Sequence, residues 1–121
     1  MDELLDSLVA KIGIDRGAAE KAVAVILDFL AKEGPAEKVQ ALINRMPGAD
    51  ALLHSAANET SAGMFGMGGI MGAGTRMMAA GLSMGQVQGV TREVIAYARV
   101  KAGEDTVGEI VESIPGLGQF V

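Results

Sequence analysis

The chain reads GIDRGAAEKAVAVILDFLAKEGPAEKVQALINRMPGADALL at residues 13–53 and GLSMGQVQGVTREVIAYARVKAGEDTVGEIVESIPGLGQFV at residues 81–121. The second stretch lies on the first without a gap at an offset of 68 residues. Residue type is kept where packing requires it: Gly13 with Gly81, Ile26 with Val94, Leu27 with Ile95, Val39 with Val107, and Pro47-Gly48 with Pro115-Gly116. A repeat that keeps its apolar pattern predicts two copies of one helical unit, each covering the hydrophobic face of the other.

Apolar residues recur at helical spacing within each copy. In the first copy they predict helices over 2–12, 16–33 and 35–46, with a short last turn at 49–54. In the second copy they predict a helix over 84–101 and another that begins after Gly103. Asp15 is a candidate N-cap, and Ser83 with Gln86 fits a capping box. The helices at 16–33 and 84–101 have the broadest apolar faces, so we expect them to meet near the axis that relates the copies.

These patterns predict an all-α fold. We expect one domain over residues 1–121, a bundle of about six to eight helices built from two pseudo-symmetric repeats. The repeats themselves are residues 13–53 and 81–121, within halves at 1–54 and roughly 62–121.

The repeat fails between the two copies, where a Gly/Met-rich connector occupies about residues 55–80. At the offset of 68 residues, Leu8 corresponds to Arg76 and Leu4 corresponds to Gly72. Nine of the 17 glycines and six of the eight methionines lie between residues 63 and 89. Because each glycine weakens a helix by up to about 1 kcal/mol, residues 63–74 do not predict a helix by themselves. They could fill the core of the second copy, form a contact surface, or remain a loop.

Flexible methionines suit an adaptable apolar contact surface. The candidate contact residues are Met64, Phe65, Met67, Ile70, Met71 and Met78. Glycines four residues apart at Gly81, Gly85 and Gly89 would also let helices approach closely. For these three we favour tight packing inside the fold.

Charge and composition limit the classes of partner that the chain can bind. The net charge is −5, there is no basic patch, and the aromatic residues are one tyrosine and three phenylalanines. The chain therefore lacks the cluster of positive charge that attracts the phosphates of a nucleic acid. The chain has no cysteine, which excludes disulfides and thiolate metal sites. The acidic N-terminus is unlike a secretory signal, and no apolar run of about 20 residues occurs, so we expect a cytoplasmic protein.

No arrangement of residues predicts catalysis, a cofactor or a metal. His54 is the single histidine, and its neighbours Asp50 and Ser55 on one short turn do not make a catalytic triad. Asp28 and Glu33 flank Lys32, a pattern that predicts solvated helix faces with weak ion pairs. The Gly-rich run lacks the preceding strand and the Gly-Lys-Ser/Thr end of a phosphate-binding loop.

The order of these features resembles small bacterial proteins classed as domains of unknown function. The likeness rests on the acidic first helix, the Lys-Ile-Gly-Ile break at 11–14, the Met-Pro-Gly-x-x-x-Leu-Leu stretch from Met46 to Leu53, and the Gly-rich centre. It implies an all-α bacterial protein, cytoplasmic or envelope-associated, with no assigned reaction and no functional residues to transfer.

Three functions are compatible with these observations. The first is a non-enzymatic interaction or structural protein that binds a protein partner, including a second copy of itself. The second is a protein that meets a membrane surface through residues 62–82, although Arg76 is the one base there. The third is a carrier of a small apolar ligand held between the halves, with Tyr97, Arg92 or Arg99 as polar anchors.

Overall fold

The computed structural model describes residues 2–46, 48–52, 69–114 and 117–119, and every regular element in those ranges is helical. The elements are α1 (Asp2–Ile12), α2 (Arg16–Glu33), α3 (Ala36–Arg45), α5 (Gly69–Ala79), α6 (Met84–Ala102), α7 (Glu104–Ser113) and the short 3₁₀ helix η1 (Leu117–Gln119). Residues 49–52 are also helical. The predicted all-α class is confirmed, and these helices begin and end within two residues of the predicted bounds where a prediction was made.

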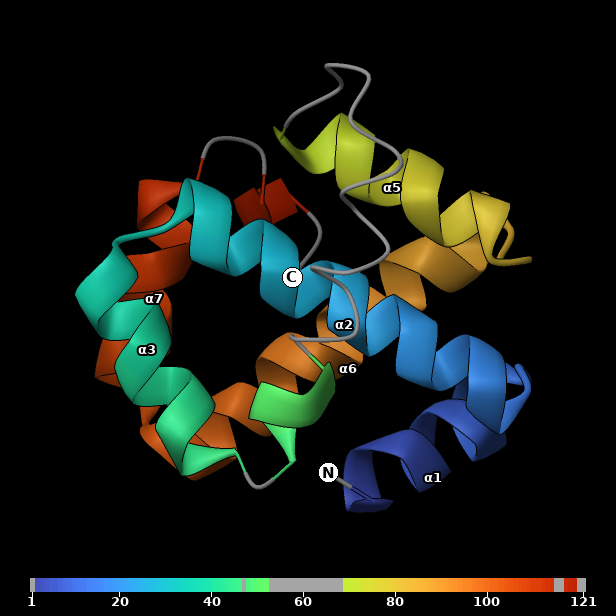
Figure 1. Cartoon of the computed structure of the whole chain (residues 1–121), viewed down its shortest axis with the longest axis horizontal. Coiled ribbons are helices and arrows are strands. Elements are labelled where there is room, and N and C mark those ends of the chain that lie inside the picture. The colour runs from blue at the N-terminus through green and yellow to red at the C-terminus, as the bar shows by residue number, and fades with distance from the viewer. Residues whose placement is uncertain (1, 47, 53–68, 115–116, 120–121) are drawn as a thin grey trace.

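Helices α2 and α6 contact each other at the centre of the molecule (Figure 1), as their broad apolar faces predict. Every residue of α2 from 22 to 30 is buried, because other helices cover that helix on all sides. On α6 the buried residues form one stripe: Val87, Val90, Thr91, Val94, Ile95 and Ala98. These two helices supply 13 of the 28 described residues of the hydrophobic core, and the other helices and turns supply the rest.

Two pairs of outer helices flank the central pair. Helices α1 and α5 each contact both α2 and α6, and α3 and α7 contact each other on the opposite side (Figure 1). Leu42 on α3 and Ile110 on α7 are both buried in the shared core. Lys38 on α3 also forms an ion pair with Glu109 on α7. Two helices whose paired residues are 71 positions apart in sequence thus hold each other on this side of the molecule.

The turns that lead into α2 and α6 each contain a glycine with a positive φ angle. Gly13 has φ of 80° and Gly81 has φ of 108°. Residues other than glycine rarely adopt such angles, so glycine allows each turn to reverse the chain within a few residues. The residue that follows each glycine, Ile14 or Leu82, is buried in the core.

The two helix starts that follow these turns differ in their capping. Ser83 and Gln86 form the predicted capping box: the Gln86 amide donates to Ser83 Oγ at 3.3 Å, and the Ser83 amide donates to Gln86 Oε1 at 2.9 Å. Asp15 occupies the N-cap position of α2, but its carboxylate accepts no capping hydrogen bond. The side-chain role predicted for Asp15 is therefore wrong. Its carboxylate is free to stay in solvent because Asp15 is exposed.

Residues 69–79 form helix α5, although their glycine content did not predict one. The burial of this helix is described from Gly74 to Ala79, and Met77 is the buried residue among these six. Contact with α2 and α6 supplies the burial that stabilises α5 against its low helix propensity. Tertiary packing therefore overrides local sequence in this segment.

Two glycines give opposite predictions for substitution by alanine. A Cβ at Gly34 would lie 2.8 Å from the backbone oxygen of Leu30 and 3.1 Å from Cγ2 of Val39, whereas a Cβ at Gly108 would meet no atom within 4 Å. We expect Gly34→Ala to lower the free energy of unfolding by about 1–3 kcal/mol, as overpacking does. Gly108→Ala lies within α7 and is expected to raise it by about 0.5–1 kcal/mol. Urea unfolding of both variants measures the difference, and equal effects of the two substitutions would contradict the packing seen at Gly34.

Candidate functional site

The structure describes only part of the predicted contact surface. Met64, Phe65 and Met67 lie outside the described residues. Ile70 and Met71 belong to helix α5, but their side chains are not among those described. Met78 lies near the end of α5, and 45% of its surface is exposed. It is thus the one predicted contact residue whose side chain can be placed, and it lies at the surface.

Met78 lies in a stretch of sequence that has no charged side chain. No Asp, Glu, Lys, Arg or His occurs from residue 77 to residue 91. The exposed residues of this stretch, which we name the uncharged corner, are Met78, Ala79, Gly81, Ser83, Met84, Gly85 and Gln88. Exposed residues on the other described helices include many charged side chains, as at Glu20 and Lys21 on α2 or Glu109 and Glu112 on α7.

The local sequence explains why this corner is presented to solvent. Gly81 permits the tight turn between α5 and α6, and the Ser83–Gln86 capping box fixes the first turn of α6. Val87 and Val90 face the core, whereas Met84 is the first residue of α6 and 53% of its surface is exposed. Sequence reasoning did not select Met84. Its spacing from Val87 and Thr91 is that of a buried position, so the periodicity of α6 gave no signal of its exposure.

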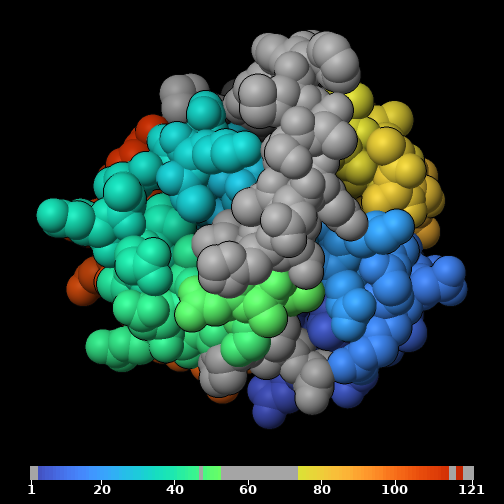
Figure 2. Space-filling view, viewed as in Figure 1, coloured from blue at the N-terminus to red at the C-terminus, as the bar shows by residue number. Residues whose placement is uncertain are grey.

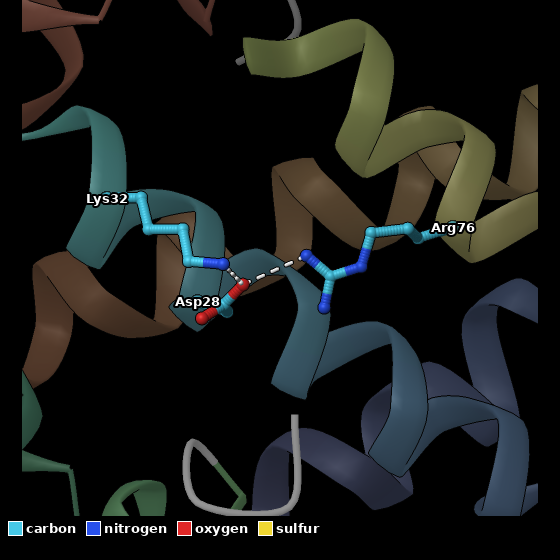
Figure 3. A network of polar contacts seen from close by, with 3 residues as sticks. All are labelled: Asp28, Lys32 and Arg76. Atoms are coloured by element: carbon cyan, nitrogen blue, oxygen red, sulfur yellow. Dashed lines mark hydrogen bonds and ion pairs between the residues drawn. The ribbon is translucent and has the colours of Figure 1, made fainter. Parts of the chain in front are cut away.

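A buried carboxylate lies on the other side of α5. The side chain of Asp28 is only 6% exposed, because it lies within the buried run of α2 from 22 to 30. Arg76 of α5 donates from Nη1 to Asp28 Oδ2 at 2.9 Å, and Lys32 Nζ lies 3.1 Å from the same oxygen (Figure 3). The segments that carry them, α2 and α5, lie side by side at the surface in Figure 2. The prediction that Asp28 lies on a solvated helix face is wrong.

The packing of α5 on α2 is the physical reason for that correction. Residue spacing along α2 placed Asp28 beside Lys32 and away from the main stripe, but α5 covers this face. A buried carboxylate is costly unless it is paired and hydrogen-bonded, and Arg76 and Lys32 supply both. Among the side chains that the structure describes, no buried polar atom lacks a hydrogen-bond partner.

A hollow of about 290 Å³ opens between α1 and α6. Its lining residues are Glu3, Leu4 and Ser7 on α1, with Glu93, Ala96, Tyr97, Val100 and Lys101 on α6. Val100 is 80% exposed, which is unusual for a large aliphatic side chain. Lys101 Nζ lies 5.5 Å from the centre of the Tyr97 ring, within the range of a cation–π contact. The hollow thus combines an apolar floor with charged groups at its edge.

The hollow includes one of the three predicted anchors for a ligand between the halves. Tyr97 lines it, whereas Arg92 and Arg99 do not. Arg92 is exposed and Arg99 is half-buried. Of the three alternative anchors, Tyr97 is therefore the one that this hollow favours.

The described ranges show no grouping of three or more His, Cys, Asp or Glu side chains that could hold a metal ion. His54 lies outside those ranges. None of the described helices has the length and apolar character needed to cross a bilayer.

No protein-family model matches this chain, and comparison with curated proteins and with solved structures found no match. The resemblance to uncharacterised bacterial proteins therefore stays a prediction. Any functional conclusion has to rest on the residues themselves.

The Asp28–Arg76 ion pair gives a prediction about stability. Arg76→Leu removes the guanidinium and leaves Asp28 buried with Lys32 alone, so we expect a loss near the low end of the about 3–5 kcal/mol typical of a broken buried pair. The double variant Asp28→Ala/Arg76→Leu removes both charges, and its free energy of unfolding should return to within about 1 kcal/mol of the unmodified chain. Guanidinium unfolding of both single variants and the double variant measures the coupling.

Lys32→Met is the control for the two single variants and the double variant. The Lys32 side chain is 56% exposed, so its loss should cost about 0–1 kcal/mol. Additive effects of Asp28→Ala and Arg76→Leu would show that the two side chains do not stabilise each other.

Proposed function

We propose that this chain is a non-enzymatic interaction protein that binds a protein partner through the uncharged corner. One observation carries the proposal: seven exposed residues between 78 and 88, two of them methionines, lie on a stretch that has no charged side chain. The partner can be a different protein or a second copy of this chain.

The composition of the corner is typical of a contact surface. The centres of protein interfaces are depleted of charged residues and enriched in methionine and aromatic residues. Exposed apolar patches mark interaction sites more often than chance would give. Met78 and Met84 have unbranched side chains that adapt to an irregular partner surface. A partner would cover both thioethers without burying an unpaired charge.

The charges near the corner favour a protein over a membrane surface. Binding to anionic lipid gains from lysines and arginines close to the bilayer. Arg76 is the base nearest to the corner in sequence, and its guanidinium is bound to buried Asp28. The membrane alternative through residues 62–82 therefore lacks a cation for lipid headgroups among the described side chains of that stretch. The ligand-carrier alternative concerns a different face, the hollow between α1 and α6.

Photo-crosslinking from a matched pair of glutamines tests the partner surface. Gln88 belongs to the corner, and Gln40 is an exposed residue of α3. We expect a photoreactive residue at position 88 to give one discrete crosslinked product in cells that express the chain, and the same residue at position 40 to give none. A product of twice the chain mass would identify a second copy as the partner.

Substitution at Met84 makes the crosslinking result specific. Met84→Glu places a carboxylate in the contact and should reduce the crosslink from position 88 by about tenfold or more, because an interface has to desolvate that charge. Val100→Glu makes the same kind of change at an exposed apolar residue far along α6 and should leave the crosslink unchanged. Equal crosslinking from positions 40 and 88, or loss of the product with both variants, would contradict the proposal.

We further propose that the chain is one domain made of two pseudo-symmetric copies, residues 1–54 and 62–121. Supporting this, residues 68 apart are buried in pairs: Leu27 with Ile95, Val39 with Val107, Leu42 with Ile110, and Met46 with Ile114. The contacts between helices are also paired at this offset. Helix α1 contacts α2 and α6, α5 contacts the same two helices, and α2 contacts α3 as α6 contacts α7.

Cleavage of the chain between the copies tests this architecture. A protease site inserted between residues 55 and 61 allows the purified protein to be cut once after folding. We expect the two fragments to elute together in gel filtration, because each copy covers the apolar face of the other. The uncut protein with the same insertion is the control. Separate elution of two folded fragments would show independent units.

A further inference from the structure

The hollow between α1 and α6 is lined by residues that correspond, at the repeat offset, to members of the Asp28 ion-pair network. At the offset of 68 residues, Ala96 corresponds to Asp28, Val100 corresponds to Lys32, and Leu8 corresponds to Arg76. Ala96 and Val100 both line the hollow. The helix contacts agree, since α1 lies on α6 and α5 lies on α2.

The residue differences between the two copies explain why charged side chains fill the site beside α2, while a hollow lies beside α6. In the network, the long side chains of Arg76 and Lys32 converge on the carboxylate of Asp28 (Figure 3). At the counterpart, Leu8 is fully buried in the core and Ala96 offers only a methyl group. The positions that correspond to Asp28, Lys32 and Arg76 therefore bring no charged side chain to the side of α6 where the hollow lies.

The groups around this space suit a cation with an aliphatic stem. Leu4, Ala96 and Val100 provide apolar surface for the stem. The Tyr97 ring already has the Lys101 ammonium group 5.5 Å from its centre, so the ring is placed to interact with a cation. Glu3 and Glu93 supply two carboxylates against the one ammonium group of Lys101 in the lining.

Glu93 is the carboxylate best placed to receive such a cation. Its side chain is 27% exposed, and Lys11 Nζ lies 3.7 Å from its Oε1, which is longer than a hydrogen bond. Lys11 itself is largely solvated, with 63% of its side chain exposed. A guanidinium group that entered the hollow could donate directly to Glu93, as Arg76 donates to Asp28 on the other side of the molecule.

We propose that this hollow is a binding site for a small alkylguanidinium ion. The stem lies on Val100, Ala96 and Leu4, and the guanidinium group donates to Glu93 with the Tyr97 ring beside it. The volume of about 290 Å³ is at the lower end for ligand pockets, so the ligand is of the size of a single amino-acid side chain. The site does not depend on the uncharged corner, which the proposed protein partner would occupy.

Titration with n-butylguanidinium, followed by amide chemical shifts, tests the site. We expect saturable shifts confined to residues 3–8 and 93–101, with a dissociation constant of about 1 mM, as for a ligand with few contacts. n-Butylurea has nearly the same shape without the charge and should bind at least about tenfold more weakly, because hydrogen bonds to a charged group are the stronger ones.

Two variants locate the binding within the hollow. Glu93→Gln keeps the shape and removes the charge, and it should weaken n-butylguanidinium binding about tenfold. Ala96→Leu fills the space left by the missing network and should abolish the saturable shifts. Glu37→Gln, at an exposed position on α3, is the matched control and should bind as the unmodified chain does. Amide spectra without ligand establish that each variant is folded.

Several results would overturn the proposal. Shifts that do not saturate, that spread over the charged surface, or that persist unchanged in both Glu93→Gln and Ala96→Leu would assign the effect to nonspecific ion binding. Equal binding of n-butylurea would show that the hollow takes apolar groups with no role for the carboxylate.

Discussion

The mutual burial of α2 and α6 is the constraint on which the rest of the structure depends. All residues of α2 from 22 to 30 are buried, and the opposing stripe of α6 is aliphatic throughout except for Thr91. Thr91 satisfies its hydroxyl group by donating to the carbonyl oxygen of Val87, four residues earlier. Removing this much apolar surface from water requires cover on every side of α2, and helices α1, α3, α5 and α6 supply it.

The outer helices cover α2 and α6 with different side chains, so the two sides of the molecule differ in surface chemistry. On α2, helix α5 brings an arginine to a buried carboxylate, which fixes the two helices at one relative position. On α6, helix α1 brings aliphatic residues and leaves a hollow at its edge. Gly89 lets α1 lie close, since a Cβ there would be 2.6 Å from Cδ1 of Ile12. The two sides of the central helix pair are thus chemically distinct.

The surface chemistry follows from the same packing. Charged side chains lie on the outer faces of α2, α3 and α7, where they remain hydrated. The α5–α6 turn has none, and its exposed methionines are the feature on which the proposed partner contact rests. A protein with net charge −5 that keeps one corner uncharged can bring that corner to another protein without charge repulsion or the desolvation of ions.

Local sequence by itself determined the helices and turns that depend on nearest neighbours. Apolar spacing predicted α2, α3 and α6, and Gly81 with Ser83 and Gln86 predicted the turn and the capping box. These features involve residues within one or two helical turns of each other, so the sequence contains all of their partners. Tertiary structure alone decided that 69–79 is a helix, that Asp28 is buried, and that a hollow lies beside Ala96. Each of these depends on a helix about 50 or more residues away or on the packing of two helices together, and local propensity does not encode such contacts.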